Sequence, residues 1–199
     1  MKIKNTLTHS LLIIALLISG CEDKEAEEQL VVESFSITLV DKITTGDETQ
    51  SQPELIRFVT DELGVIVNSE QNSVDFINIT PSGITMSGQS VQITQDADAD
   101  ASSIDVSVDE SILAVVVSKG ACLRGELYLI NTSTLQKYGP YELGFNPDAV
   151  DIAVDNKFVV VVNEFDYEDG VDGGCQTLGF PGVSVYDISA GIDKATLVK

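Results

Sequence analysis

The stretch of sequence that decides the fold occurs twice, as IDVSVDESILAVVVSKG at 104–120 and as VDIAVDNKFVVVVNEFD at 150–166. Each copy begins with alternating apolar and polar residues, turns at an aspartate and continues into an unbroken apolar run. Alternation is typical of a β-strand with two unlike faces, and a short apolar run is typical of a strand covered on both faces. We therefore expect one apolar face on each first strand, formed by Ile104, Val106 and Val108 and by Val150, Ile152 and Val154.

A third, more divergent copy precedes these two. The aspartates that end the first strands are spaced by 48 and 46 residues, and they are Asp61 (in LIRFVTDELG), Asp109 and Asp155. A later strand of each copy ends at a short polar side chain that can hydrogen-bond to the backbone and turn the chain, and these residues are Asn78, Asn131 and Asp187. A period of about 40–50 residues with β-type content predicts a propeller or a related array.

Each copy holds enough sequence for the four strands of a propeller blade, with the fourth strand at 84–94, at 135–144 and only begun at 195–199. The expected fold is all-β, with three four-stranded β-propeller blades at 53–98, 99–146 and 147–199, the last incomplete. Three blades are too few for a closed ring, because propellers typically have about four to eight. We therefore expect an incomplete ring and the N-terminal portion of a longer propeller. Self-association and an unstable truncated product are the alternatives.

Two segments resemble a known family. NPDAVDIAVDNKFVVVVNEFD (146–166) and GVSVYDISAGIDKATL (182–197) resemble the bacterial secreted propellers called choice-of-anchor I proteins, which pair a PD…DGKY…VANE strand hairpin with a later GSVSIIDLS…ATV strand. The matching positions are Pro147, Asp148, Asp155, Asn163, Glu164, Asp187 and Ser189. The chain departs from the family at Asn156, where the family has glycine, and in EFDY (164–167), where the family has EGEP. More broadly, the units are similar to lactonase-like YVTN repeats. The resemblance implies blade structure and no particular reaction.

The N-terminus, MKIKNTLTHSLLIIALLISGC, is typical of a secretory signal, with two lysines ahead of an apolar run at 11–18. The run is too short to span a membrane, which takes about 20 apolar residues. Its end, ISGC, resembles the bacterial lipoprotein signal, which implies cleavage between Gly20 and Cys21 and acyl chains such as palmitate on Cys21. Glu22 after the cysteine implies the outer rather than the inner membrane. An ordinary signal peptide with a chance cysteine is the alternative.

This interpretation divides the chain into three parts. They are a signal peptide at 1–20, a lipidated and acidic tether at 21–52 with a further strand at 31–43, and the blades at 53–199. The tether is expected to be solvated, because its first residues are charged and have no apolar face. The protein is then expected in the bacterial cell envelope, attached to the membrane by its lipid, since several acyl chains anchor a protein stably.

The composition lacks residues that many enzymes and nucleic-acid-binding proteins use. The 32 Asp and Glu against 11 Lys and Arg give a net charge of −21, which repels a phosphate backbone, so no nucleic-acid partner is expected. The only histidine, His9, lies in the signal segment, and tryptophan is absent. A mature chain without histidine forms neither a Ser-His-Asp triad nor an imidazole metal site.

These features favour a binding or scaffold propeller on the cell envelope, without catalysis. The expected partner is an envelope protein or a polysaccharide, held by the loops that follow the second strands. One alternative is a lactonase-like or phosphoesterase-like enzyme whose catalytic groups lie largely in further blades. The other is a fragment with no independent function.

Two of those loops carry the remaining candidate residues. Cys122 and Cys175 lie one in each loop, and an even number of cysteines in an exported chain favours a disulfide between them, with two separate thiols as the alternative. The loop at 164–182 is also rich in carboxylates, which are ligands that Ca²⁺ prefers. The candidate calcium ligands are Glu164, Asp166, Glu168, Asp169 and Asp172. A solvated acidic loop is the alternative, and no other cofactor is expected.

Overall fold

The computed structural model describes residues 41–45, 51–120, 123–164 and 182–198. Asp41–Lys199 forms one compact unit, and Met1–Val40, the other unit, lies outside the described residues. The described part of the chain consists of β-strands, one 3-10 helix and connecting segments. It includes no helix long and apolar enough to cross a membrane. The prediction of an all-β fold is confirmed.

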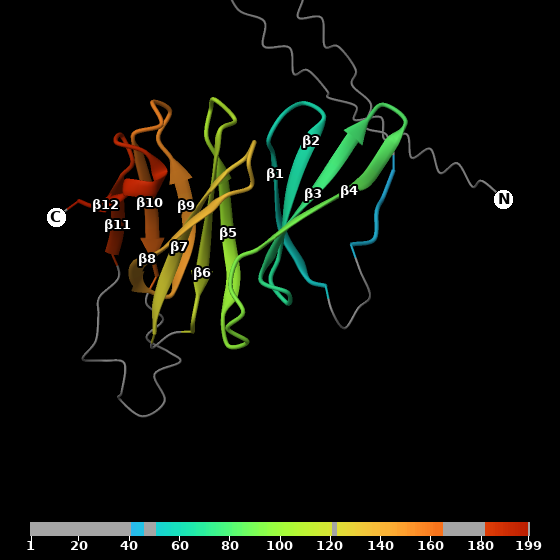
Figure 1. Ribbon diagram of the computed structural model, residues 1–199. Coiled ribbons are helices and arrows are strands. Elements are labelled where there is room, and N and C mark those ends of the chain that lie inside the picture. The colour runs from blue at the N-terminus through green and yellow to red at the C-terminus, as the bar shows by residue number, and fades with distance from the viewer. Residues whose placement is uncertain (1–40, 46–50, 121–122, 165–181, 199) are drawn as a thin grey trace, which may run out of the picture. The chain divides into compact units, whose positions relative to one another are not determined.

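The strands form three four-stranded sheets, which lie side by side (Figure 1). The first sheet contains β1 (Pro53–Phe58), β2 (Leu63–Asn68), β3 (Ser73–Thr80) and β4 (Gly83–Gln92). The second contains β5 (Asp100–Val106), β6 (Ile112–Ser118), β7 (Arg124–Asn131) and β8 (Lys137–Phe145). The third contains β9 (Pro147–Ile152), β10 (Phe158–Asn163), β11 (Gly182–Asp187) and the short β12 (Thr196–Leu197), with the 3-10 helix η2 (Ile192–Lys194) before β12.

The three sheets are copies of one unit. In each, the strands are antiparallel and pair in chain order. The last residue of the first strand always pairs with the second residue of the next strand, as Phe58 with Gly64, Val106 with Leu113 and Ile152 with Val159. The repeated sequence thus folds into sheets with the same strand register. One sheet lies within each of the segments 53–98, 99–146 and 147–199.

The aspartate of the second unit fixes the turn after β5. The Asp109 carboxylate accepts hydrogen bonds from the hydroxyls of Ser107 and Ser111, both at 2.7 Å, and from the Ser111 N–H at 3.2 Å. These bonds favour the charged form, so the pKa of Asp109 lies below its usual value, with the Ser107 bond as the largest cause.

The other two aspartates occupy the same place in their units but have different partners. Asp155 accepts the Lys157 N–H at 3.1 Å and pairs with the Lys157 ammonium at 3.2 Å, and the backbone bond is the main cause of its lowered pKa. In the first unit the turn between the strands is one residue shorter. There the Val59 N–H bonds to the Leu63 carbonyl at 2.7 Å, and the Asp61 carboxylate makes no hydrogen bond to the described residues.

The polar residues expected at the end of the third strands are equivalent in register but not in conformation. Asn78, Asn131 and Asp187 each pair with the first residue of the second strand. The Asn131 side chain accepts the Thr134 N–H at 2.8 Å and turns the chain. Asp187 does the same with the N–H and hydroxyl of Ser189, and these bonds lower its pKa.

The turn predicted at Asn78 is wrong. The β3–β4 pairing continues two residues beyond Asn78, to Thr80, and the turn falls at Pro81–Ser82. There the hydroxyls of Thr80 and Ser82 lie 2.9 Å apart, and Thr80 also donates to the Gly83 carbonyl. The strand continues because polar groups at its own end close the turn.

The apolar face predicted for the first strands is one residue too long. Ile104, Val150 and Ile152 are buried as expected, whereas Val108 and Val154 are exposed. Both exposed residues lie in the turns, where the chain has already left the sheet. The continued alternation of residue types therefore does not mark a continued strand.

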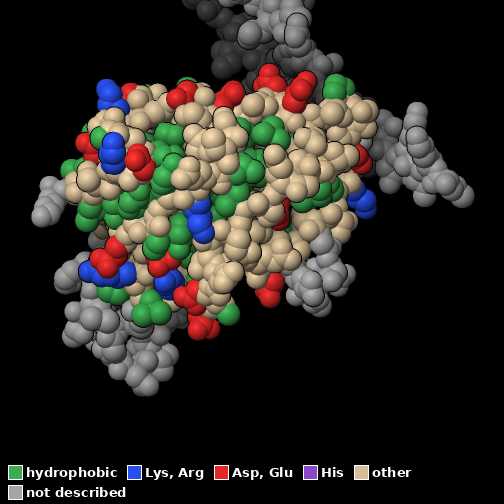
Figure 2. Space-filling model, viewed as in Figure 1, with side chains coloured by type: hydrophobic (Ala, Val, Ile, Leu, Met, Phe, Trp, Pro, Cys, Tyr) green, Lys and Arg blue, Asp and Glu red, His purple; other side chains and the backbone are tan. Residues whose placement is uncertain are grey.

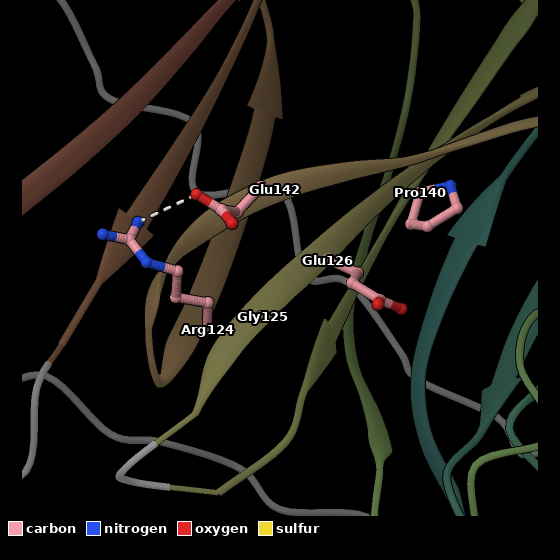
Figure 3. Close-up of a pocket in the computed structure, with 5 residues that line it drawn as sticks. All are labelled: Arg124, Gly125, Glu126, Pro140 and Glu142. Carbon is pink, nitrogen blue, oxygen red and sulfur yellow. Dashed lines mark ion pairs between the residues drawn. The ribbon is translucent and has the colours of Figure 1, made fainter.

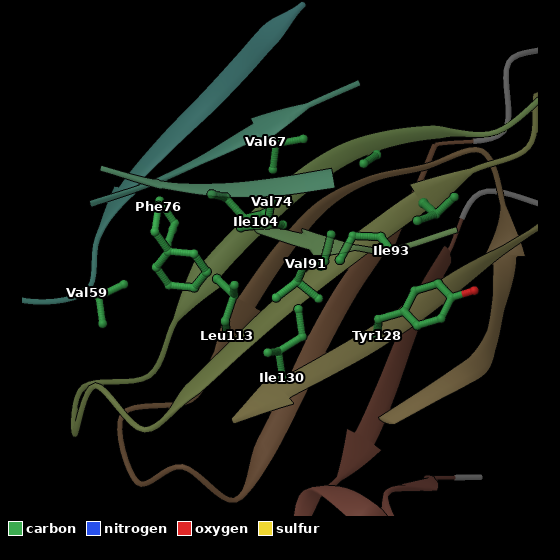
Figure 4. Packing of buried hydrophobic residues seen from close by; sticks show 14 of the residues in the cluster. Val59, Val67, Val74, Phe76, Val91, Ile93, Ile104, Leu113, Tyr128 and Ile130 are labelled. Atoms are coloured by element: carbon green, nitrogen blue, oxygen red, sulfur yellow. The ribbon is translucent and has the colours of Figure 1, made fainter. Parts of the chain in front are cut away.

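The core lies between the sheets. β5 contacts β1 and β2 of the first sheet, and β9 contacts β5 and β6 of the second. Phe76, Val74 and Val67 of the first sheet pack against Leu113 and Ile130 of the second (Figure 4). A second cluster joins the second and third sheets, and it includes Val116, Leu127, Leu129, Val159, Val161 and Tyr186. Each fully buried aliphatic side chain contributes about 1.5–3 kcal/mol.

Polar side chains align neighbouring sheets. The buried Asn72 donates to the Ala99 carbonyl at 2.5 Å and accepts the Ala101 N–H at 2.8 Å, so it joins the start of β3 to the start of β5. Asp105 accepts the Ile152 N–H of β9 at 2.8 Å. Each pair of adjacent sheets therefore has an apolar contact and at least one hydrogen bond between them.

The inter-sheet core generates a stability prediction. Leu129→Ala should lower the free energy of unfolding by about 2–5 kcal/mol, because Leu129 is fully buried between the second and third sheets. The matched control is Leu123→Ala, since Leu123 is exposed, and it should change stability by less than about 0.5 kcal/mol. Urea denaturation of the two variants measures the difference, and equal destabilisation would contradict the assigned core.

Candidate functional site

A shallow hollow of ≈ 150 Å³ opens beside the start of β7 and the middle of β8. Its lining residues are Arg124, Gly125, Glu126, Pro140 and Glu142 (Figure 3). The β7–β8 pairing shifts register twice here, between Arg124 and Glu126 and again between Leu127 and Leu129. Such bulges redirect side chains, and they are frequent beside binding sites.

The position of Gly125 depends on its missing side chain. A Cβ at Gly125 would overlap the ring of Pro147 at the start of β9. The third sheet can therefore approach this part of β7 only because residue 125 is glycine. The contact between Gly125 and Pro147 fixes the backbone at the rim of the hollow, since Arg124 and Glu126 lie on either side of Gly125.

One ion pair lies across the hollow. The Arg124 guanidinium is 3.2 Å from the Glu142 carboxylate (Figure 3). It also donates to the Leu143 carbonyl and lies over the Phe145 ring. Both charged side chains are more than half exposed. A pair this exposed contributes at most about 1 kcal/mol to stability, so it can be exchanged for contacts to a ligand at low cost.

The second carboxylate of the hollow has two partners already. One Glu126 oxygen is 2.6 Å from the Lys119 ammonium, and the other accepts the Tyr128 hydroxyl at 2.7 Å. Lys119 also lies 3.6 Å from Asp96. The hydrogen bond that Lys119 donates to Glu126 is the main cause of a raised Lys119 pKa, and burial followed by the hydrogen bond to Glu126 raises the pKa of Tyr128.

This arrangement suits recognition better than catalysis. Both carboxylates of the hollow have cationic partners, so neither is an unpaired base in this structure. The hollow is open to solvent, and its lining has no hydroxyl or thiol nucleophile. Its charged oxygens and guanidinium N–H groups can hydrogen-bond a polar ligand.

The charged residues of this site were not singled out from the sequence. Alternating charge is visible in LRGELY at 123–128, and it indicates that Arg124 and Glu126 share a strand with an exposed face. The partners Lys119 and Glu142 come from other strands or loops, and no local pattern connects them.

Asn163, one of the positions that match the family motif, has a structural role. It is buried, its oxygen accepts the Gly144 N–H at 2.9 Å, and its amide donates to Ser184 at 3.0 Å and to the Gly182 carbonyl. It therefore joins β8 of the second sheet to β10 and β11 of the third. The neighbouring Glu164 is exposed, and its N–H donates to the Asn146 carbonyl.

Most of the other candidate residues lie outside the described residues. These are Gly20, Cys21, Cys122, Cys175, Asp166, Glu168, Asp169 and Asp172. Of the candidate calcium ligands only Glu164 is described. Within the described segments, no group of three or more His, Cys, Asp or Glu side chains is arranged to hold a metal ion.

Solved structures with a similar fold have little sequence identity with this chain. A periplasmic gluconolactonase from Pseudomonas aeruginosa has a TM-score of 0.54 at 12% identity, covering 75% of this chain and 39% of its own. Candidate 6-phosphogluconolactonases from Bacteroides uniformis (TM-score 0.58, 15% identity, 77% and 41%) and Bacteroides fragilis (0.57, 16%, 75% and 38%) are also similar. The chain thus spans about two fifths of these structures, and the likeness establishes the fold alone.

Comparison by sequence gives the family. No curated protein matches the chain. The family model described as the choice-of-anchor I domain matches residues 55–199, which include all three sheets except the first two residues of β1. With three sheets of one register and this match over most of its length, the chain belongs to the choice-of-anchor I family.

Proposed function

We propose that this chain is a lipid-anchored protein of the bacterial cell envelope whose propeller blades bind a ligand and catalyse no reaction. The anchor rests on the signal-like N-terminus and on Cys21 after a small-residue pair. Binding rests on the hollow between β7 and β8, in which charged groups are exposed but mutually neutralised. An acidic tether between lipid and blades gives the binding surface reach from the membrane.

The chemistry of the hollow favours an envelope polysaccharide as the ligand. Arg124 offers a planar set of donors, and Glu126 and Glu142 offer acceptors on the same surface. Sugar hydroxyls both donate and accept hydrogen bonds, so they match this mixed lining. A purely anionic ligand fits less well, because the two carboxylates and the net charge of −21 repel it.

Catalysis of lactone hydrolysis is the second candidate function. It is supported by the fold shared with the gluconolactonase from Pseudomonas aeruginosa. Catalytic groups would then lie largely in further blades, because the carboxylates of this hollow already have cationic partners.

The lipid anchor predicts in which cell fraction a variant without Cys21 is found. Cys21→Ala should move the protein from the membrane fraction to the soluble fraction and should change its mass, because no acyl acceptor remains. Fractionation with mass measurement of the purified chain reads both effects. Unchanged membrane association and mass in the variant would overturn the lipoprotein proposal.

The hollow predicts that one substitution in its lining weakens ligand binding. On an array of bacterial envelope polysaccharides, Arg124→Ala should weaken the signal of the full chain at least about tenfold, as loss of a charged hydrogen-bond donor costs about 1.5–3 kcal/mol. The matched control is Arg57→Ala, which removes an arginine paired with Asp105 away from the hollow and should leave binding unchanged. Equal loss in both variants, or an array without signal, would contradict the assignment.

The two candidate functions differ in one direct assay. Proton release from glucono-δ-lactone should be no faster with the full chain than with buffer, since the hollow offers no unpaired general base. The heat-denatured chain serves as the control. A rate that rises in proportion to chain concentration would favour the lactonase over the binding protein.

A further inference from the structure

The two carboxylates of the hollow differ in how firmly they are held. Glu126 and Glu142 are register partners on β7 and β8, so both side chains lie on one face of the second sheet. The Glu142 side chain is 72% exposed, and its ion-pair partner Arg124 is itself more than half exposed. The Glu126 side chain is only 19% exposed and has a partner at each oxygen. The hollow thus combines an exchangeable ion pair with a fixed acceptor.

The first partner of Glu126 is a lysine that is restrained in turn. The Lys119 ammonium lies 2.6 Å from Oε1 of Glu126 and 3.6 Å from Asp96, in the connection between the first and second sheets. Only 22% of the Lys119 side chain is exposed. The bond to Glu126 raises the pKa of Lys119, so its side chain stays charged. Lys119 therefore restrains one oxygen of Glu126 through a charge-assisted hydrogen bond.

The second partner is a tyrosine that the core between two sheets holds in place. Tyr128 is 6% exposed, and it packs in the cluster that joins the first and second sheets (Figure 4). The Lys137 ammonium lies 5.0 Å from the centre of its ring. The Tyr128 hydroxyl donates to Oε2 of Glu126 at 2.7 Å. The orientation of the Glu126 carboxylate is therefore set by the packing of the sheets.

A carboxylate held in this way still has acceptor capacity. An ionised carboxylate has about four lone-pair sites, and Lys119 and Tyr128 each use one, on different oxygens. Each oxygen can therefore accept a further hydrogen bond from a group in the hollow, which Glu126 lines. Two acceptor atoms joined to one carbon match two donors on neighbouring atoms. Neighbouring hydroxyl groups of a sugar ring are such a pair.

The charges at the hollow favour a ligand without charge. Arg124 and Lys119 balance Glu142 and Glu126. Around them the chain is acidic, with a net charge of −21, and Figure 2 shows acidic side chains along the upper and lower margins of one face. This surface repels an anionic polysaccharide and does not repel a neutral one.

We propose that Glu126 is the specificity-determining acceptor of the hollow and binds two neighbouring hydroxyl groups of a neutral polysaccharide, with Lys119 and Tyr128 as its positioning residues. This inference rests on the proposed function and narrows its ligand class. Arg124 and Glu142 contact further hydroxyl groups once their exposed ion pair opens. An acceptor that is already fixed loses little side-chain entropy on binding, which favours affinity.

The test uses the full chain on an array of neutral and anionic envelope polysaccharides, each printed untreated and after periodate oxidation followed by borohydride reduction. Periodate cleaves the bond between carbons that bear neighbouring hydroxyl groups, and borohydride reduces the resulting aldehydes to alcohols. The wild-type chain should bind untreated neutral polysaccharides and lose at least about tenfold of that signal on their oxidised forms, because bonds to a charged acceptor are lost. Equal signal on both forms, or signal on anionic polysaccharides alone, would overturn this inference and leave the proposed function. An array without signal would overturn both.

Substitutions separate positioning from folding. Tyr128→Phe keeps the ring and should weaken binding about two- to tenfold, because Glu126 must then be ordered on binding. Glu126→Gln should weaken binding at least about tenfold, and adding Tyr128→Phe to it should have no further effect, since no carboxylate remains to be positioned. The matched control is Tyr141→Phe, which removes a hydroxyl bonded to the Ile192 carbonyl and should leave binding unchanged. Additive losses in the double variant, or an equal loss in the control, would refute the positioning role.

Lys119 is tested by rescue. Lys119→Met should weaken binding as Tyr128→Phe does, whereas Lys119→Arg keeps a cation beside Glu126 and should retain most of the binding. Circular dichroism equal to wild type shows that each variant folds. Equal losses in the two Lys119 variants would mean that its charge does not position Glu126.

Discussion

The fold depends on apolar sheet faces that are buried only when another sheet lies against them. β6 is the clearest case, because its five central residues are buried, with the first sheet on one side and the third on the other. A single sheet of this kind would leave the aliphatic side chains of both faces in water, at about 1.5–3 kcal/mol for each. The sheets are therefore stable as a stack, and bonds such as those of Asn72 set the alignment of neighbours.

The repeat was predictable because alternation and spacing are local properties of the chain. The strands and register around Ile104 and Val150 follow from them. Strand ends were less predictable. Asn78 has the residue type of a turn, yet backbone pairing continues past it to Thr80, and Val154 continues the alternation after the strand has ended. Both outcomes depend on which hydrogen bonds close the turn, and residue order alone does not specify them.

The charged hollow could not be predicted from the sequence, for a different reason. Arg124 and Glu142 meet across two strands whose bulges shift the pairing, and Lys119 reaches Glu126 from the preceding strand's end. Such contacts join residues that are not neighbours in any periodic pattern. The motif residue Asn163 was found from the sequence, but only the structure shows that its amide joins two sheets and so supports the fold rather than chemistry.

The bond from Asp105 to the Ile152 N–H has an evolutionary consequence. Its acceptor is a side chain, but its donor is the main chain, which every residue type except proline supplies. The hydrogen bond between units therefore asks for little at the receiving position, where the buried Ile152 side chain serves the packing instead. A gene for such units can gain one by duplication or lose one by deletion, and the new junction finds its donor already in place. Lineages with different numbers of units can descend from one ancestral module.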